Sequence, residues 1–132
     1  MRILQLCPKP PRPSLDGGCL AMDAITRGFV AQGHNVKMLV VSTEKHPFNI
    51  EELDSDYIKS TAIEAVSIDT ALNPTDALKN MVQGKSYHIA RFYSKDFINK
   101  LEEILSNSQF DIIFVESLFL SSYAPIIRAH SN

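Results

Sequence analysis

The sequence predicts an α/β fold in which a mainly parallel sheet is covered by helices on both faces. Two observations predict this. Short, almost wholly apolar runs alternate with segments in which apolar residues recur at helical spacing. Apolar runs without polar alternation are typical of strands buried on both faces, as in parallel sheets. The 132 residues, 45% of them hydrophobic, suffice for one core of ordinary size, so we expect a single domain over residues 1–132.

The first forty residues or so have the pattern of a βαβ unit. Residues 3–7 form an apolar run typical of a buried strand, and residues 8–18 follow as a stiff loop with four prolines and two glycines. From Cys19 apolar residues recur at helical spacing up to Gly33, a favoured residue for closing a helix in the left-handed conformation. Residues 36–41 then predict a second strand.

The middle of the chain predicts a loop and two short strands. Residues 43–54 are polar and predict a loop, with a short helix at 49–53. Two strands are expected next, at 57–59 and at 62–68, the second with alternating apolar positions.

Two helices follow the predicted strands. Asn73 ahead of Pro74 is a helix start, and it predicts a short helix to Val82 that closes at Gly84. Apolar residues that repeat every four positions then predict one long amphipathic helix over residues 86–106.

The last part of the chain predicts a strand and a helix. Residues 110–116 read as another buried strand that meets polar residues only at its ends, and residues 118–130 are helical in pattern. The resulting order, β-α-β-(β-β)-α-α-β-α, implies a sheet with helices on both faces.

Composition and charge exclude several classes of protein. Thirteen Lys and Arg against 15 Asp and Glu leave no basic excess, so nucleic acid is not an expected partner. The apolar run at the start is too short for a secretory signal, and no later run reaches the roughly 18 to 20 residues of a spanning helix, so we expect a cytoplasmic protein. Cys7 and Cys19 are expected to be packing thiols, and four scattered histidines give no metal-ligand spacing. Neither a metal nor a bound cofactor is expected.

Polar residues at two predicted strand ends are the candidate site, because ligands of open α/β sheets bind at the carboxyl ends of the strands. Asp16, Gly17 and Gly18 precede the first helix, where glycines allow backbone amides to approach a phosphate or a sugar hydroxyl. Alternatively, the glycines only form the turn into the helix. Glu116 ends an apolar strand, so its carboxylate must be solvated, paired or used in function. Ser117 is a further candidate ligand, or simply the cap of the next helix.

Arg91 is the remaining candidate substrate ligand. It lies on the polar side of the helix predicted over 86–106, where the alternative is a solvated surface charge. The dinucleotide fingerprint Gly-x-Gly-x-x-Gly is absent, and the loop after the first strand is far longer than that motif uses. An NAD(P)-dependent oxidoreductase is therefore disfavoured.

Three segments together resemble the opening of glycosyltransferase family 4. They are residues 1–6, the proline-rich loop that ends in Gly17-Gly18, and residues 29–36. That family opens with a strand, a Gly-Gly loop, a helix ending in L-x-x-x-G-H-x-V and a second strand, and Gly33, His34 and Val36 match the last motif. Residues 110–116 look like the family's later strand, written F-D-V-V-H-x-H or with glutamate last. The resemblance spans the chain and is looser over residues 43–85.

The resemblance implies a GT-B architecture, in which two Rossmann-like, doubly wound domains face each other. Acceptor recognition lies mostly on the first domain, which this chain resembles, and nucleotide-sugar binding mostly on the second, C-terminal domain, which is absent here. It also implies that Gly17 and Gly18 approach the donor diphosphate or the acceptor. The family's frequent histidine at the end of the later strand aligns with Glu116, the expected catalytic residue, as acceptor ligand or base.

The function implied is that of a retaining glycosyltransferase of hexosyltransferase type, which needs no bound metal. It would transfer a sugar from a nucleotide-sugar donor to a sugar or lipid-linked acceptor in glycan, polysaccharide or glycolipid synthesis. The family's second acidic motif, two glutamates separated by seven residues, belongs to the absent domain, so we expect the chain alone to be inactive. A lipid-linked acceptor would place it peripherally at the inner membrane face. Weak self-association is expected through the face that would pack on the second domain.

A standalone flavodoxin-like or nucleotide-binding module without transferase activity is the alternative, and a reading frame that continues for another domain beyond Asn132 would argue against it. The transferase hypothesis makes one geometric demand. Gly17-Gly18 and Glu116 must border the same edge of a parallel sheet. Opposite edges, or an antiparallel sheet, would exclude it.

Overall fold

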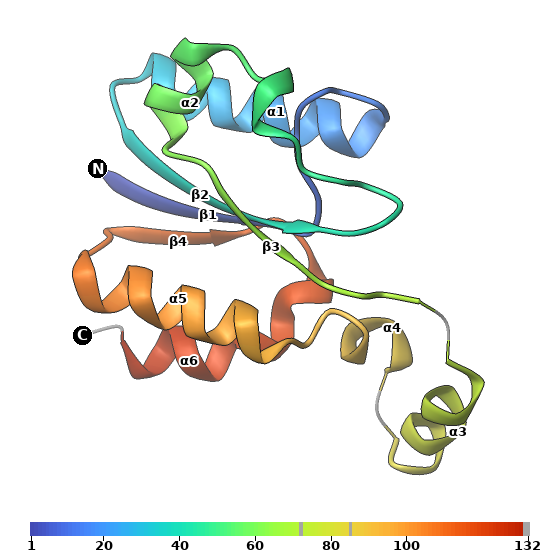
Figure 1. The fold of residues 1–132 in the computed structure, drawn as a ribbon. Helices are drawn as coiled ribbons and strands as arrows, with labels where there is room; N and C mark the ends of the chain where they lie inside the picture. The colour runs from blue at the N-terminus through green and yellow to red at the C-terminus, as the bar shows by residue number, and fades with distance from the viewer. Residues whose placement is uncertain (72, 85, 131–132) are drawn as a thin grey trace.

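Four parallel strands form the centre of the fold. The computed structural model describes residues 1–71, 73–84 and 86–130, the side chains of residues 76, 77 and 80 excepted. The strands lie in the order β3-β2-β1-β4 (Figure 1), and they are β1 (Arg2–Cys7), β2 (Asn35–Ser42), β3 (Glu64–Ser67) and β4 (Ile112–Val115). This is the strand order that opens a Rossmann-like sheet.

Helices cover both faces of the sheet, as predicted. Figure 1 shows α1 (Gly17–Ala31) and α2 (Ser55–Thr61) on one face, and α5 (Lys95–Asn107) and α6 (Ala124–Ala129) on the other. Successive residues of a strand point to opposite faces. In β1, Leu4 and Leu6 therefore pack with Phe97 and Leu101 of α5, whereas Cys7 packs in the cluster on the α1 and α2 face. The chain is thus a doubly wound, Rossmann-like α/β fold.

Helix α1 begins and ends close to where the sequence predicted. Asp16 caps its amino end, since the carboxylate accepts a hydrogen bond from the Cys19 amide at 2.9 Å. At the other end Gly33 has φ +77°, and the amides of Gly33 and His34 donate to the carbonyls of Val30 and Phe29. These two bonds form a Schellman motif, which needs a left-handed residue at the position of Gly33.

Residues 57–59, predicted to be a strand, are helical. They belong to α2, whose first turn is capped by the Asp54 carboxylate, which accepts from the Tyr57 amide at 2.7 Å. The helix ends at Ala62 in the left-handed conformation, φ +42°. The prediction was wrong because the capping carboxylate decides the local structure of so short a segment. The short helix expected at 49–53 is confirmed as the 3-10 helix η1 (Ile50–Glu52), and the strand expected at 62–68 as β3.

The single helix predicted over residues 86–106 is two helices. Helix α3 (Pro74–Val82) is confirmed, with Asn73 as its cap. It is followed by α4 (Tyr87–Ala90), a break, and then α5. At the break the Tyr123 hydroxyl donates to the carbonyl of Phe92 and accepts from the amide of Ser94, and Ser94 caps α5. The apolar period continues across the break because both helices pack on the segment around Tyr123, so the pattern did not reveal it.

Strand β4 lies at the edge of the described sheet and is not buried on both faces. Ile112 and Val115 are 39% and 37% exposed, which contradicts the prediction of a buried strand. Ile113 packs with the core on the α5 face, and Phe114 meets Phe29 of α1 edge to face at 5.8 Å. The helix predicted over 118–130 starts as the 3-10 helix η2 (Leu118–Tyr123) and continues as α6.

The proline-rich loop is clamped to two helices by Arg12. Its guanidinium pairs with Asp23 of α1 at 2.7 Å and with Asp54, the cap of α2, at 2.8 Å. It also lies over the Tyr57 ring, 4.1 Å from the ring centre. The clamp holds the β1–α1 connection against the α1 and α2 face, which fixes how the loop approaches the carboxyl end of β1.

Candidate functional site

The candidate site lies at the carboxyl edge of the sheet, between β1 and β4. From β1 the chain crosses through α1 to β2 on one side, whereas β4 pairs with β1 on the other side. This point, where the strand order reverses, is where ligands of open α/β sheets bind. The end of β4 is held there, because Leu6 pairs with Val115 and the Glu116 amide donates to the Leu6 carbonyl at 3.0 Å.

Glu116 lies at this point and its carboxylate faces the side of α1. It accepts a hydrogen bond from Nε2 of Gln5 at 2.6 Å, and Oε1 of Gln5 accepts in turn from the Thr26 hydroxyl of α1 at 2.9 Å. Burial raises the pKa of Glu116, and the bond from Gln5 opposes that rise. A half-buried carboxylate with a raised pKa and a fixed orientation can accept a proton or a hydrogen bond from a ligand hydroxyl.

A hollow of about 450 Å³ opens beside Glu116. Ser117 also lines it, together with apolar side chains of β4, η2 and α6, namely Val115, Leu118, Leu120, Ala124 and Ile127. The Ser117 hydroxyl accepts from the Phe119 amide at 3.2 Å, so it caps η2, as the alternative interpretation expected. Gly17 and Gly18 do not line this hollow, so the structure brings the two halves of the candidate site to one edge without joining them in one cavity.

The amino end of α1 forms the other half of the site. Asp16 and Lys9 pair there, with Nζ of Lys9 at 2.8 Å and 2.6 Å from the two carboxylate oxygens. The bond from Lys9 and that from the Cys19 amide hold the pKa of Asp16 well below its usual range. Among the residues that the structure describes, no acceptor lies on the amides of Gly17 and Gly18, so both can donate to a ligand.

The two glycines differ in what surrounds them. A Cβ at Gly18 would lie 3.2 Å from Nζ of Lys9 and 3.2 Å from a carboxylate oxygen of Asp16, whereas a Cβ at Gly17 would meet nothing within 4 Å. Neither glycine is among those with positive φ. A side chain at Gly18 would therefore need Lys9 and Asp16 to move by a few tenths of an ångström, whereas one at Gly17 would need no such movement.

Sequence reasoning missed three residues of this site. Gln5 was treated only as part of a strand, although a polar residue inside an apolar run signals a buried hydrogen bond. Lys9 lies in the proline-rich loop, whose sequence gives no signal that a lysine there has a role. His46 is predicted only as one of four scattered histidines; it lies in the loop after β2, where its carbonyl accepts from the Thr43 amide at 3.1 Å, and burial and the charge of Lys9 lower its pKa. No spacing in the sequence connects His46 with Lys9.

Arg91 lies away from Glu116, at the end of α4. Its Nε donates to the Thr70 carbonyl at 2.7 Å, Nη2 donates to the same carbonyl, and the guanidinium is 5.8 Å from the centre of the Tyr87 ring. These contacts tie α4 to the segment that follows β3. The structure thus gives Arg91 a structural role, and its role as a substrate ligand stays a prediction.

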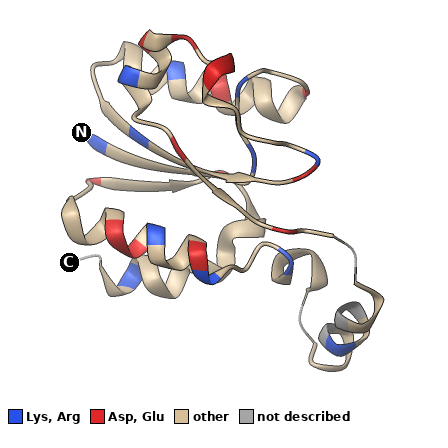
Figure 2. Cartoon of the chain, in the orientation of Figure 1, with Lys and Arg blue, Asp and Glu red and all other residues tan. Residues whose placement is uncertain are grey.

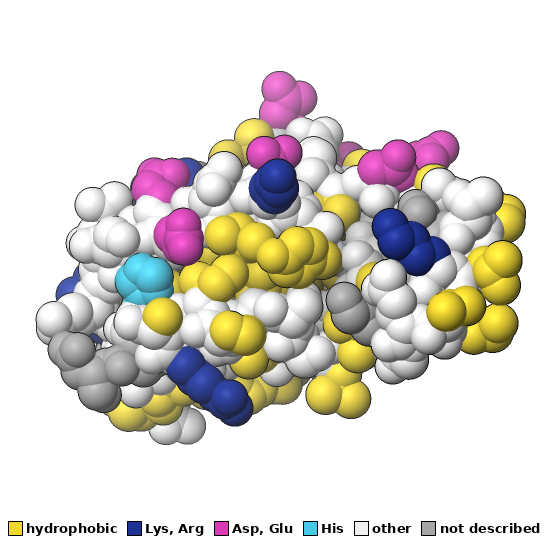
Figure 3. All heavy atoms as spheres, turned by 90° about the horizontal axis from the view of Figure 1, so that it is seen from below, with side chains coloured by type: hydrophobic (Ala, Val, Ile, Leu, Met, Phe, Trp, Pro, Cys, Tyr) yellow, Lys and Arg dark blue, Asp and Glu magenta, His cyan; other side chains and the backbone are white. Residues whose placement is uncertain are grey.

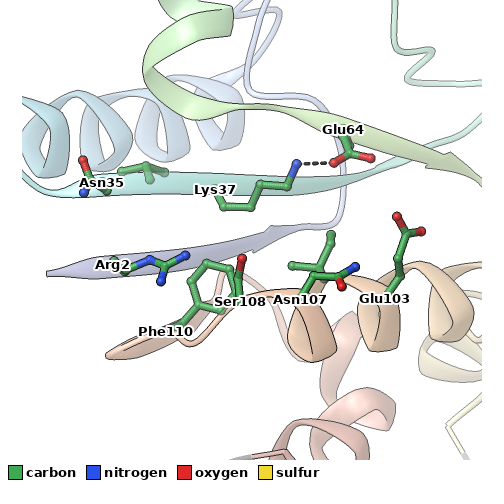
Figure 4. A pocket seen from close by; sticks show the side chains of 10 residues that line it. Arg2, Asn35, Lys37, Glu64, Glu103, Asn107, Ser108 and Phe110 are labelled. Atoms are coloured by element: carbon green, nitrogen blue, oxygen red, sulfur yellow. Dashed lines mark hydrogen bonds and ion pairs between the residues drawn. The ribbon is translucent and has the colours of Figure 1, made fainter.

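A second cavity, of about 370 Å³, lies at the opposite edge of the sheet (Figure 4). It is lined by the start of β1, β2 and β3 and by the end of α5, through Arg2, Asn35, Lys37, Glu64, Glu103, Asn107, Ser108 and Phe110. Its charges largely satisfy one another, since Glu64 pairs with Lys37 and, at 2.5 Å, with Lys100. Helix amino ends do not point to this edge of a parallel α/β sheet, so we place the candidate site at the carboxyl edge.

Within residues 1–71, 73–84 and 86–130 no group of three His, Cys, Asp or Glu side chains is arranged to hold a metal ion. In the same described residues no helix is both long enough and apolar enough to cross a membrane. The chain matches no protein-family model, no curated protein and no solved structure.

Proposed function

We propose that this chain is the acceptor-side, Rossmann-like half of a retaining glycosyltransferase of GT-B architecture. One observation carries the proposal. Glu116 and the amino end of α1 border the same edge of a parallel sheet, on the two sides of its switch point. The alternative arrangements that would have excluded the transferase hypothesis, opposite edges or antiparallel strands, do not occur among the described residues.

Glu116 would act on the acceptor. Its carboxylate is oriented by Gln5 and is only half buried, so it can accept a hydrogen bond from an acceptor hydroxyl at the carboxyl edge of the sheet, next to the hollow that Glu116 borders. The raised pKa makes the carboxylate a stronger base for that hydroxyl proton. The apolar side chains of the same hollow suit the carbon skeleton of a sugar or of a lipid-linked acceptor.

The amino end of α1 would act on the donor phosphates. The amides of Gly17 and Gly18 are available donors, and the ammonium of Lys9 supplies a positive charge beside them. Lys9 already pairs with Asp16, so a phosphate would share that ammonium with the carboxylate. We therefore expect this half alone to bind a nucleotide diphosphate weakly, because a second domain would supply the remaining contacts. The enzyme would work in the cytoplasm or at the inner membrane face.

The test is a titration of the isotope-labelled chain, followed by the backbone amide signals in two-dimensional NMR spectra. Uridine and guanosine diphosphates and their sugar conjugates are the ligands, with NADH and NADPH as competitors. We expect weak binding that shifts the signals of Gly17, Gly18 and Glu116. Shifts confined to the opposite edge, no response to any diphosphate, or tight binding of NADH or NADPH would each overturn the proposal.

A pair of alanine variants sharpens the test. In Gly18→Ala the new methyl group would lie 3.2 Å from Nζ of Lys9 and from a carboxylate oxygen of Asp16. Diphosphate binding should weaken by about tenfold, which is the loss expected for one good charge-assisted contact. Gly17→Ala has open space around the new methyl group and is the matched control, which should bind as the wild type does. Equal effects of the two changes would show that the ligand does not approach Gly18.

A further inference from the structure

Helix α3 projects from the body of the protein and presents an apolar face to solvent. In Figure 1 it stands apart from the sheet and from the helices that cover it, beyond α4. Leu78, Met81 and Val82 are 60%, 70% and 79% exposed. Their spacing of three and four residues places them side by side on one face of the helix. Figure 3 shows hydrophobic side chains gathered at the end of the molecule where α3 lies.

Positive charge gathers on the same part of the chain. The described residues from Asn73 to Lys95 include three basic residues, Lys79, Arg91 and Lys95, against one acidic residue, Asp76. Their net charge is +2, whereas the whole chain has a net charge of −2. No carboxylate that the structure describes pairs with Lys79, Arg91 or Lys95, whereas in the body Lys9, Arg12, Lys37 and Lys100 are all paired. Figure 2 shows where Lys and Arg (blue) and Asp and Glu (red) lie along the chain.

We propose that α3 and the segment up to Lys95 dock the protein on an anionic lipid bilayer. The apolar side chains at positions 78, 81 and 82 would enter the boundary between headgroups and acyl chains. Lys79 follows Leu78 on the helix and borders the apolar face, so its ammonium can reach a lipid phosphate while its stem stays among apolar groups. A flat bilayer can reach a helix that projects, and the local charge of +2 complements anionic headgroups.

The chain contains no tryptophan, so a single introduced tryptophan reports on its own position by fluorescence. Met81→Trp places one fluorophore on the proposed docking face, and Leu20→Trp places one at an exposed position of α1. Vesicles of phosphatidylcholine, with and without phosphatidylglycerol, are added to each variant. We expect the emission of Met81→Trp to shift to shorter wavelength with the anionic vesicles and that of Leu20→Trp to stay unchanged. Shifts of both reporters, or no shift at all, would overturn the proposal.

Cosedimentation with the same vesicles tests the side chains themselves. The triple change Leu78→Ser, Met81→Ser and Val82→Ser should weaken binding by at least about tenfold, because most of the apolar area that enters the bilayer is lost. The matched control changes three other exposed apolar residues, Leu15→Ser, Leu20→Ser and Ile50→Ser, and should bind as the wild type does. Both triple variants alter exposed positions, so unchanged circular dichroism spectra should show that both fold.

Reversing the charge of one lysine tests whether anionic lipid, and not another ligand, binds this face of α3. Lys79→Glu should weaken vesicle binding by about tenfold, since two units of charge change at an anionic surface, whereas Lys59→Glu on α2 should have little effect. Equal binding to neutral and anionic vesicles would contradict the role of charge. Self-association that the 78, 81 and 82 changes abolish, without vesicle binding, would instead show a protein interface. None of these results depends on the proposed transferase function, because no donor or acceptor is present.

Discussion

The buried side-chain amide of Gln5 in β1 donates to the carboxylate of Glu116 at the end of β4, at 2.6 Å. Gln5 is fully buried, and its oxygen accepts from Thr26 of α1, so one side chain connects two strands and a helix. The carboxylate thereby has a fixed position at the edge of the sheet where ligands of this fold class bind. Removing this contact should therefore change both the stability of the fold and the proton affinity of Glu116.

Gln5→Leu should raise the pKa of Glu116 above its wild-type value. Burial already raises that pKa, and the amide of Gln5 is the contact that opposes burial. The change also leaves the half-buried Glu116 carboxylate without its donor, so we expect a loss of about 1–3 kcal/mol in the free energy of unfolding. NMR titration of the Glu116 side chain and chemical unfolding measure the two effects. Thr26→Val is the control, because it removes the other partner of Gln5 and leaves the bond to Glu116 in place.

Glu116→Gln should stabilise the protein at neutral pH. The folded-state pKa of Glu116 lies above its ordinary value of 4.5, so the folded protein binds the proton more tightly than the unfolded chain does. The wild type therefore has its full stability from this group below pH 4.5 and loses it as the pH rises through the folded-state pKa. The variant has no such loss, so at pH 7 it should be more stable by roughly 0.5 kcal/mol, a small value because the group is partly exposed.

Urea unfolding at pH 7 and at pH 4 checks this sign. The difference between the Glu116→Gln variant and the wild type should shrink toward zero at the lower pH, where both side chains are mostly neutral. A variant that is less stable than the wild type at pH 7 would show that the bond from Gln5 outweighs burial. A more stable variant would fit a functional carboxylate that is retained in spite of its cost to the fold.

Arg12→Met should free the proline-rich loop. The guanidinium contacts Asp23 and Asp54 and lies over the Tyr57 ring, and the Asp23 side chain is only 8% exposed. Asp23 keeps Arg27 as a partner, so we expect a loss of about 1–3 kcal/mol and not the larger loss of an isolated buried charge. Amide exchange in residues 9–16 should become faster. Arg12→Lys should not restore the wild type, because a single ammonium cannot reproduce the forked contacts.

Arg27→Met is the matched control for this change. Arg27 pairs with the same carboxylate of Asp23 but is 64% exposed, so its loss should cost no more than about 0.5 kcal/mol and should leave the exchange of the loop unchanged. Equal effects of the two substitutions would mean that the pairing of Asp23, and not the position of Arg12, holds the loop.

Much of the fold could be predicted from the sequence because its signals are local. The apolar runs predicted β1 and β2, and Gly33 predicted the end of α1, since a left-handed position at a helix end favours glycine. The candidate site was predicted in part for the same reason. Asp16 and Glu116 are next to strand or helix ends that the sequence reveals, whereas Lys9 meets Asp16 only through the folded loop.

The errors occur where a tertiary contact overrides the local pattern. The sequence predicts a strand at residues 57–59, but the Asp54 carboxylate accepts from the Tyr57 amide and starts a helix there. Strand β4 was predicted to be buried because it is apolar, but apolar composition does not distinguish a central strand from an edge strand. The break between α4 and α5 depends on Tyr123, about thirty residues further along the chain, and no window of sequence around the break contains it.

Tyr123→Phe tests that last relationship directly. The ring of Tyr123 is fully buried against Phe97, and its hydroxyl donates to the Phe92 carbonyl and accepts from the Ser94 amide. Phenylalanine keeps the ring but leaves both backbone groups without this partner, so we expect a loss of about 1–3 kcal/mol and faster exchange of the Ser94 amide. Tyr93→Phe is the control, since Tyr93 is 55% exposed and should change stability by less than about 0.5 kcal/mol. If both variants were equally stable, packing of the ring alone would hold the break, and the two hydrogen bonds would not be required for it.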